Sequence, residues 1–235
     1  MKAFPTKQQR SERTRDKLLQ AGRLLLRSGG FDDMSIAQIS ARAGCSVGSF
    51  YLRFRNKEAY FEFLMDGIGE EVREDAREQL NAESVAGLTL TQTVRRCVDH
   101  YVEVHRQHEG LIRAALQYGI NGSDDWQPMR DNGLWLHAHY IALIMGKLRR
   151  HDPVQAEQQL MIGLQIISGH LVNSIAHPQT TLPLHHPDTG HWLAEMVMHS
   201  LKVPLAASST ADHSTASSPR ASRSPRPTRT PRRTE

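Results

Sequence analysis

Apolar residues recur along most of the chain every three to four positions, which is the spacing of an α-helix with one buried face. Two helix starts carry capping boxes, Ser35 with Gln38 and Thr89 with Gln92. Asn56 is typical of the start of another helix, because its side chain can accept from a free backbone N–H. The pattern predicts helices over about residues 7–28, 35–43, 46–52, 57–80, 89–108, 110–118, 125–150, 153–177 and 189–202.

Some segments depart from this simple pattern. Residues 134–145 are apolar almost all round, which predicts a helix buried in the middle of its domain. The last two helices carry double apolar stripes, and we expect them to pair with the same helices of a second copy as a four-helix bundle. Gly29 and Gly30 are predicted to end the first helix, and residues 121–124 to form a loop.

The composition argues against several other classes of protein. Aromatic residues make up 6% of the chain and Val and Ile form no alternating runs, so a β-rich fold is disfavoured. No apolar run reaches the length of a membrane span, and the polar segment 1–15 lacks the apolar middle of a secretory signal. Cys45 and Cys97 suit the reducing cytoplasm, where we expect this protein, and both are interpreted as small buried apolar residues.

Charge is distributed unevenly along the chain. Residues 1–57 hold 12 Lys/Arg and 4 Asp/Glu, residues 58–205 hold 11 and 19, and residues 206–235 hold 6 and 2. A basic N-terminal region on an acidic body is expected of a nucleic-acid-binding protein that touches phosphates with one end. The last segment is rich in Ser, Thr, Pro and Arg and has no apolar face, which predicts a disordered tail.

Residues 35–57 carry the most specific pattern, two short helices flanking a turn at Gly44-Cys45. Ile39, Ala43, Phe50 and Phe54 are spaced to form one small core between the two helices. Gly44 stands where such a turn requires a positive φ, which glycine adopts without steric cost. This is the spacing of a helix-turn-helix, whose second helix enters the major groove of DNA.

The residues of this segment resemble those of the TetR family of bacterial regulators. The likeness covers residues 14–64 and is carried by the run from Ala43 to Tyr51, then Arg53-Phe54 and Asn56-Lys57-Glu58. Three positions depart from the family pattern, Ser35 for threonine, Ser40 for alanine and Arg55 for proline, and none removes a group that a DNA contact needs. The resemblance implies an all-helical homodimer with a divergent ligand-binding body.

Chemistry and this resemblance together assign candidate DNA contacts. Val47 and Ser49 are suited to base edges, and Gly48 allows the backbone to approach DNA closely. The resemblance implies phosphate contacts for Tyr51 and Lys57. Each role has a plainer alternative, such as a simple helix cap or a solvated charge. The expected DNA-binding residues are Ser35, Ser46, Val47, Gly48, Ser49, Tyr51, Arg53 and Lys57.

The remaining residues point to binding and not to catalysis. The thirteen histidines include no set of three at a convincing metal-ligand spacing, and no nucleophile elbow or phosphate-binding glycine loop is present. We therefore expect no metal, cofactor or catalytic residue. A mostly apolar pocket with a few polar groups is expected in the body, although simple core packing explains the same residues. Its candidate lining residues are His100, Trp135, His139, Tyr140 and Gln165.

The sequence thus predicts an all-α chain in three parts. Residues 1–57 form a three-helix helix-turn-helix DNA-binding domain, residues 58–205 a larger helical ligand-binding and dimerisation domain, and residues 206–235 the tail. The expected function is that of a DNA-binding transcriptional regulator, a repressor that a small molecule releases from its operator. The expected partners are double-stranded DNA with a near-palindromic operator, a second copy of the chain and an unidentified small molecule, with no membrane. Two alternatives stay open, a regulator controlled by a protein partner and an enzyme with an accessory DNA-binding head.

Overall fold

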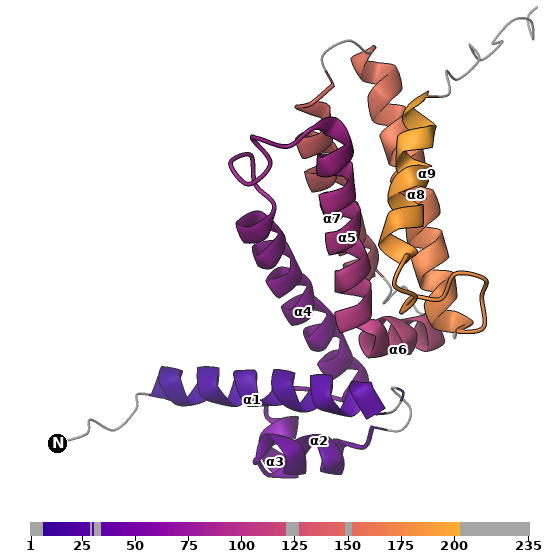
Figure 1. Cartoon of the computed structure of the whole chain (residues 1–235). Helices are drawn as coiled ribbons and strands as arrows, with labels where there is room; N and C mark the ends of the chain where they lie inside the picture. Colours follow the sequence, from indigo (N-terminus) through magenta and orange to yellow (C-terminus); the bar gives the residue numbers. More distant parts are fainter. Residues whose placement is uncertain (1–6, 29, 31–33, 121–126, 149–151, 203–235) are drawn as a thin grey trace, which may run out of the picture. The chain divides into compact units, whose positions relative to one another are not determined.

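The described residues of this computed structural model are 7–28, 30, 34–120, 127–148 and 152–202, and their regular secondary structure is entirely helical. The all-α prediction is therefore confirmed. Figure 1 shows α1, α2 and α3 together at one end and the later helices as a separate bundle that α4 joins to them. The helices are α1 (Lys7–Ser28), α2 (Ile36–Ala43), α3 (Val47–Tyr51), α4 (Lys57–Gln79), α5 (Leu90–Gln107), α6 (Glu109–Ile120), α7 (Gln127–Met145), α8 (Pro153–Ala176) and α9 (Thr189–Lys202).

The helix starts follow from local side-chain hydrogen bonds. Ser35 Oγ accepts from Gln38 N at 3.2 Å, and the Gln38 side chain accepts from Ser35 N at 2.8 Å. The same reciprocal pair forms at Thr89 and Gln92, so both predicted capping boxes are confirmed. Asn56 Oδ1 accepts from the backbone N of Ala59 at 2.9 Å and begins α4. Each cap supplies an acceptor to a backbone donor that has no partner within the helix.

Helices α1 to α4 share one aromatic core. Phe50 is fully buried, with its ring centroid 5.2 Å from that of Phe54 and 5.4 Å from that of Tyr60. The Tyr60 hydroxyl donates to the carbonyl oxygen of Leu18 at 2.7 Å, which ties α4 to α1. The short helix α3 is thus held in place by side chains that reach into a core built largely by longer helices.

Helix α7 corrects one expectation about the body. Leu136, Tyr140 and Ile144 are buried, but Leu134 is 59% exposed and Ala138 and Ala142 are exposed as well. The prediction of a helix buried all round is wrong, because α4, α5 and α8 cover only part of its circumference. An apolar sequence on every side does not by itself reveal which face remains open.

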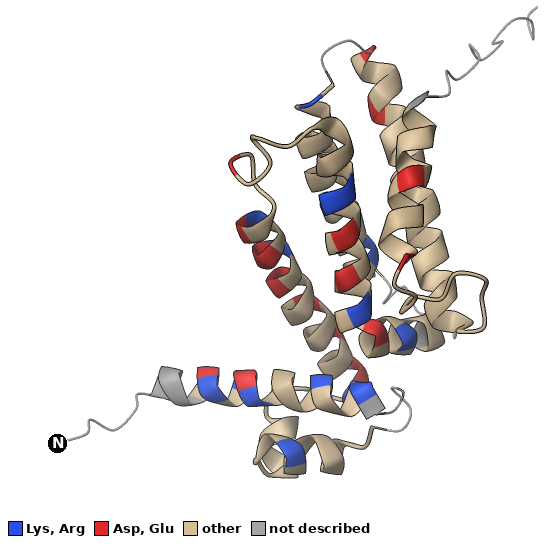
Figure 2. Cartoon of the chain, in the orientation of Figure 1, with Lys and Arg blue, Asp and Glu red and all other residues tan. Residues whose placement is uncertain are grey.

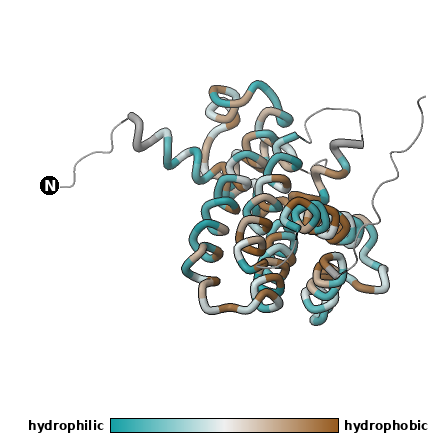
Figure 3. Tube along the Cα trace, turned by 90° about the horizontal axis from the view of Figure 1, so that it is seen from above, coloured by the Kyte–Doolittle hydropathy of each residue, from teal (hydrophilic) through white to brown (hydrophobic). Residues whose placement is uncertain are grey.

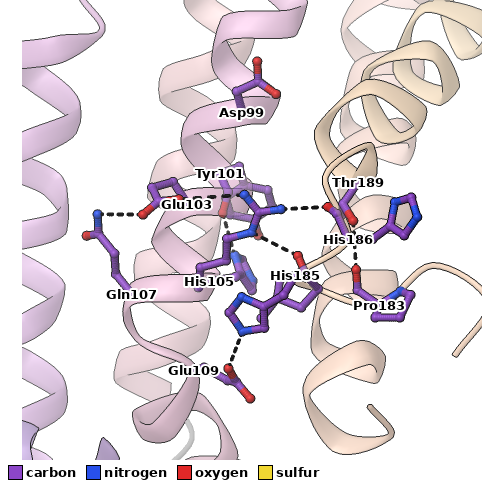
Figure 4. A network of polar contacts seen from close by, with 12 residues as sticks. Asp99, Tyr101, Glu103, His105, Gln107, Glu109, Pro183, His185, His186 and Thr189 are labelled. Carbon is purple, nitrogen blue, oxygen red and sulfur yellow. Dashed lines mark hydrogen bonds and ion pairs between the residues drawn. The ribbon is translucent and has the colours of Figure 1, made fainter. Parts of the chain in front are cut away.

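The segment between α8 and α9 is fastened to α5 and α6 (Figure 4). Arg106 Nε donates to the carbonyl of Leu184 and Arg106 Nη2 to that of His186, both at 3.0 Å. His185 Nε2 lies 2.8 Å from Glu109 Oε2. Because the guanidinium binds backbone carbonyls, it fixes the path of the loop and with it the start of α9.

Hydrophilic residues interrupt the hydrophobic ones along the helices of the described chain (Figure 3), and none of these helices is long and apolar enough to cross a membrane. Cys97 is buried as expected, whereas Cys45 is only half-buried. Gly29, the loop 121–124 and the tail 206–235 lie outside the described residues.

Candidate nucleic-acid interface and body cavity

The turn between α2 and α3 has the geometry that the sequence pattern requires. Gly44 adopts φ 64° and ψ 37°, in the left-handed region, and its N–H bonds back to the end of α2. Residues that carry a Cβ rarely adopt this backbone conformation, so glycine is favoured at the turn. Ile39, Ala43 and Phe50 are buried between the two helices, which sets the angle between α2 and α3.

The first turn of α3 presents a small, exposed surface. Val47 is 42% exposed and Tyr51 is 54% exposed, although both are large apolar or aromatic side chains. A Cβ built on Gly48 would meet its nearest atom, Ser46 Oγ, only at 3.8 Å, so the space beside this backbone is open. The exposure of Val47 and Tyr51 leaves both side chains accessible to a binding partner.

The other predicted contacts lie around this surface. Ser46 begins α3, with its Oγ accepting from Ser49 N at 3.1 Å and lying 2.9 Å from Ser49 Oγ. Arg53 is exposed and donates to the carbonyl of Ser49 at 3.3 Å. Lys57 is the first residue of α4, and Ser35 caps α2 on the preceding turn. The structure thus places all eight predicted residues within the segment from the start of α2 to the start of α4.

Two further basic residues belong beside this surface. Arg42 in the last turn of α2 and Arg55 before α4 are both exposed. Residues 34–57 contain no Asp or Glu, so their positive charge is unopposed within the segment. Acidic residues gather instead on the second half of α4, away from α3 (Figure 2). Charge alone could have indicated Arg42 and Arg55, but the sequence does not show that both side chains are exposed.

A cavity of about 840 Å³ lies in the body between α4, α5, α6, α7 and α8. Its size falls in the range of small-molecule sites, which are mostly apolar with a few polar groups. Apolar side chains dominate the wall. Among those lining it are Met65, Ile68, Val72, Tyr101, His105, His108, Leu111, Met129, Arg130, Gly133, His137, Ile141, Met145, Glu157, Met161, Gln165 and Ser168.

Of the five residues expected to line such a pocket, one lies on the cavity wall and four lie elsewhere. Gln165 lies on the cavity wall. Tyr140 is fully buried, its Oη 2.7 Å from His100 Nδ1, and His100 Nε2 is 3.2 Å from Asp75 Oδ2. His139 Nε2 binds the carbonyl of Leu80 at 2.7 Å, and its ring stacks on Trp135.

Four of the five, His100, Trp135, His139 and Tyr140, are thus absent from the wall of this cavity and instead join α7 to α4 and α5. Helical spacing is the physical reason, because neighbours of a cavity-lining residue such as His137 project from other faces of the same helix. Burial is the largest influence on His100 and lowers its pKa, while the nearby Asp75 acts in the opposite direction. No group of three or more His, Cys, Asp or Glu side chains with the arrangement of a metal site occurs in the described parts of the chain.

The helix-turn-helix segment matches a known family. Residues 18–63 match the sequence model described as bacterial regulatory proteins of the tetR family. The helix-turn-helix segment of this chain is therefore similar to that of the TetR family. This match agrees with the resemblance that residues 14–64 carry in the sequence.

One curated relative and several solved structures are also similar to this chain. Over 90 residues it is 29% identical to the uncharacterized HTH-type transcriptional regulator YwcC of Bacillus subtilis, an alignment that spans 37% of this chain and 40% of that relative. Its fold is similar to that of Salmonella enterica GusR, with a TM-score of 0.56 and 20% identity over 81% of this chain and 96% of that one. A tetR-family regulator from Streptomyces coelicolor gives a TM-score of 0.59 at 15% identity, over 80% and 79% of the two chains.

Proposed function

We propose that the protein is a sequence-specific DNA-binding transcriptional repressor of the cytoplasm, which a small molecule releases from its operator. The observation that carries the DNA-binding part is the exposed first turn of α3, held at a fixed angle by the buried residues of the helix-turn-helix. A short helix with Val47 and Gly48 exposed and Ser49 half-buried beside them can enter a major groove, where base edges are read.

The roles of the surrounding residues follow from their chemistry. Ser35, Ser46, Tyr51 and Lys57 are assigned to the phosphate backbone, and Arg53 to either a guanine or a phosphate. Phosphate contacts orient the protein on DNA, whereas base contacts select the sequence. The two groups of residues therefore make different predictions for binding.

Single substitutions test this assignment. Lys57→Ala should weaken binding to all DNA sequences alike and reduce the slope of log affinity against log salt by about one unit. Ser49→Ala should instead change which bases are preferred, with little effect on the salt slope. Thr91→Ala, at an exposed position on α5 in the body, is the control and should change neither quantity. If Lys57→Ala leaves affinity and salt slope unchanged, the interface is assigned wrongly.

An apolar outer face on α8 and α9 supports homodimerisation. Ile162, Ile166, Trp192 and Met196 are each about half exposed and lie one helical turn apart in pairs on their helices. Large exposed apolar side chains grouped in this way mark a protein interaction surface. Paired with the same face of a second copy, they would form a four-helix bundle with two-fold symmetry.

The other apolar face of α8 packs inside the chain and is not available for a dimer interface. Leu171 and its neighbours Leu164 and Ile167 are fully buried within one chain, so a charge there would disrupt folding as well as assembly. Ile166→Glu is the sharper test and should give a folded monomer in sedimentation equilibrium. Leu24→Glu, at an exposed apolar position on α1, should stay dimeric. A wild-type monomer at micromolar concentration would contradict the proposal.

Ligand control is supported by the position of the cavity relative to α1. Ile68, His108 and Leu111 line the cavity and also a smaller pocket beside Arg23 and the end of α1. A ligand that displaces α6 would therefore also shift α1 at the DNA-binding end. Converting a population from 99:1 to 1:99 requires about 5.5 kcal/mol of differential binding, which two sites in a dimer would share.

Linkage gives the test of ligand control. If a ligand weakens operator binding, operator DNA must weaken ligand binding by the same factor. Thermal-shift screening of small molecules, followed by titration of each hit with and without operator, measures both sides. A compound whose affinity is unchanged by operator is bound but does not act as an inducer. If no compound binds and Gly133→Trp, which places a bulky side chain at the cavity, leaves regulation intact, control by a protein partner is favoured.

A further inference from the structure

The cavity wall carries a set of polar groups whose hydrogen-bonding roles are fixed by their neighbours. The Tyr101 hydroxyl donates to Ser168 Oγ at 3.0 Å. Its oxygen lies 3.0 Å from His137 Nε2, so this ring nitrogen carries the proton and donates to Tyr101. In a neutral ring the proton on Nε2 leaves Nδ1 of His137 as an acceptor.

His105 is fixed in the opposite tautomer. Its Nδ1 lies 2.8 Å from the carbonyl oxygen of Tyr101, which can only accept, so Nδ1 carries the proton. Nε2 of the neutral His105 ring is therefore an acceptor. His105 and His137 both line the cavity and flank the ring of Tyr101, with centroid distances of 4.6 and 5.4 Å. One region of the wall thus combines aromatic faces with two acceptor nitrogens.

Burial keeps these rings uncharged at neutral pH. It is the largest influence on His105 and lowers its pKa to about 4, and it lowers the pKa of His137 as well. The same cause lowers the pKa of His108, a third histidine on the wall, to about 4. The histidines therefore offer lone pairs and not positive charge to a ligand.

Full charges are scarce around the cavity. Among the described residues that line it, Glu157 is the one carboxylate and Arg130 the one guanidinium. Both are exposed, Arg130 with 57% of its side chain accessible, so water screens them. A cation transferred into the apolar interior would lose its hydration without gaining a buried counter-charge, which is strongly unfavourable.

We propose that the cavity binds an uncharged, largely apolar molecule that carries a hydroxyl donor, of which an aromatic phenol is the simplest case, and that it discriminates against cations. The apolar body of the ligand would pack against the methionine, leucine and isoleucine side chains, and its hydroxyl would donate to Nδ1 of His137. This inference rests on the proposed ligand-binding function of the body and names its ligand class.

Three matched probes test the inference on the full-length protein: 4-hydroxystilbene, 4-methoxystilbene and 4-(trimethylammonio)stilbene. They share one apolar frame and differ in a donor, an acceptor and a fixed positive charge. Isothermal titration should show the hydroxyl compound binding about tenfold tighter than the methoxy compound, since a hydroxyl that meets a buried acceptor gains about one hydrogen bond. The ammonium compound should bind more weakly than either.

Two variants on α7 test whether His137 causes the preference for the hydroxyl compound. His137→Phe keeps a ring but removes the acceptor, and it should reduce the tenfold preference to less than threefold while retaining 4-methoxystilbene binding. His139→Phe is the matched control, because His139 lies on the same helix but binds the Leu80 carbonyl away from the cavity, and it should keep the preference. Gly133→Trp places an indole in the cavity and should abolish binding of all three probes. The backbone should tolerate this side chain, because a Cβ at Gly133 meets no atom within 4 Å. Circular dichroism melting confirms that each variant is folded.

The outcomes separate this inference from the proposed function. If the three probes bind equally, or the ammonium compound binds best, and Gly133→Trp abolishes that binding, the cavity is a ligand site but its proposed ligand class is wrong. If no probe binds the wild-type protein, the ligand class is also overturned. Ligand control would then depend on the linkage test with operator DNA, which does not use these probes.

Discussion

The contact between α6 and α1 offers a direct test of how the body communicates with the DNA-binding end. Gly110 lies so close to α1 that a Cβ on it would stand 2.1 Å from the carbonyl oxygen of Leu26. Ordinary contact begins at 3.4 Å, so Gly110→Ala forces the two backbones apart by roughly 1.3 Å. Neither atom belongs to a flexible side chain that could move aside.

The expected cost follows from this displacement. Overpacking a well-packed site destabilises a protein by about 1 to 3 kcal/mol, and urea denaturation should show a loss of that size for Gly110→Ala. Because α1 packs against α2 of the helix-turn-helix, its shift should also reduce operator affinity by at least about fivefold, the factor that corresponds to 1 kcal/mol. Fluorescence anisotropy at a temperature well below the melting transition measures the affinity of the folded protein.

Gly87→Ala is the matched control, because a Cβ at Gly87 meets no atom within 4 Å. It should leave both stability and operator affinity within error of the wild type. If Gly110→Ala also behaves like the wild type in both assays, α6 and α1 are not in tight contact. The proposed coupling between the cavity and the DNA-binding end is then refuted. A loss of stability with full operator affinity would show that the contact is structural and carries no signal.

Three further predictions concern stability. Ser40→Ala should raise the free energy of unfolding by about 1 kcal/mol in urea titrations, because the buried Ser40 hydroxyl has no hydrogen-bond partner; unchanged or lower stability would contradict this. Tyr60→Phe should cost about 1 kcal/mol, since it removes the buried hydrogen bond from the Tyr60 hydroxyl to the carbonyl of Leu18, and a neutral effect in the same assay would count against that bond. Burial lowers the pKa of His105 and His108 from 6.5 to about 4, so the unfolded chain binds protons first and stability should fall as the pH drops from about 6.5 toward 4. Urea midpoints at pH 7 and pH 5 measure this fall, and equal midpoints would refute it.

Local features of the fold were predictable from the sequence because they depend on neighbouring residues. The capping boxes at Ser35 and Thr89, the cap at Asn56 and the left-handed turn at Gly44 each involve atoms within a few residues of one another. The helix-turn-helix core was predictable for the same reason, since the separation of Ile39 and Phe50 is short. Helix bounds therefore agree with the spacing of apolar residues.

The faces that helices present to one another depend on distant residues and could not be predicted in this way. Helix α7 is apolar on nearly every side, so its sequence does not show that His137 lines the cavity while His139 and Trp135 pack toward α4. Gly110 similarly contacts Leu26, a residue far from it along the chain.

The most direct test of the central claim is selection of DNA sequences by the purified full-length protein from a random library, followed by footprinting. The structure and its proposed dimer predict enrichment of a near-palindrome whose half-sites lie about 34 Å apart or a modest multiple of that distance. Enrichment should be lost when Val47, Ser49 and Lys57 are replaced together by alanine. Recovery of no preferred sequence, or of the same sequence with the triple variant, would contradict the account.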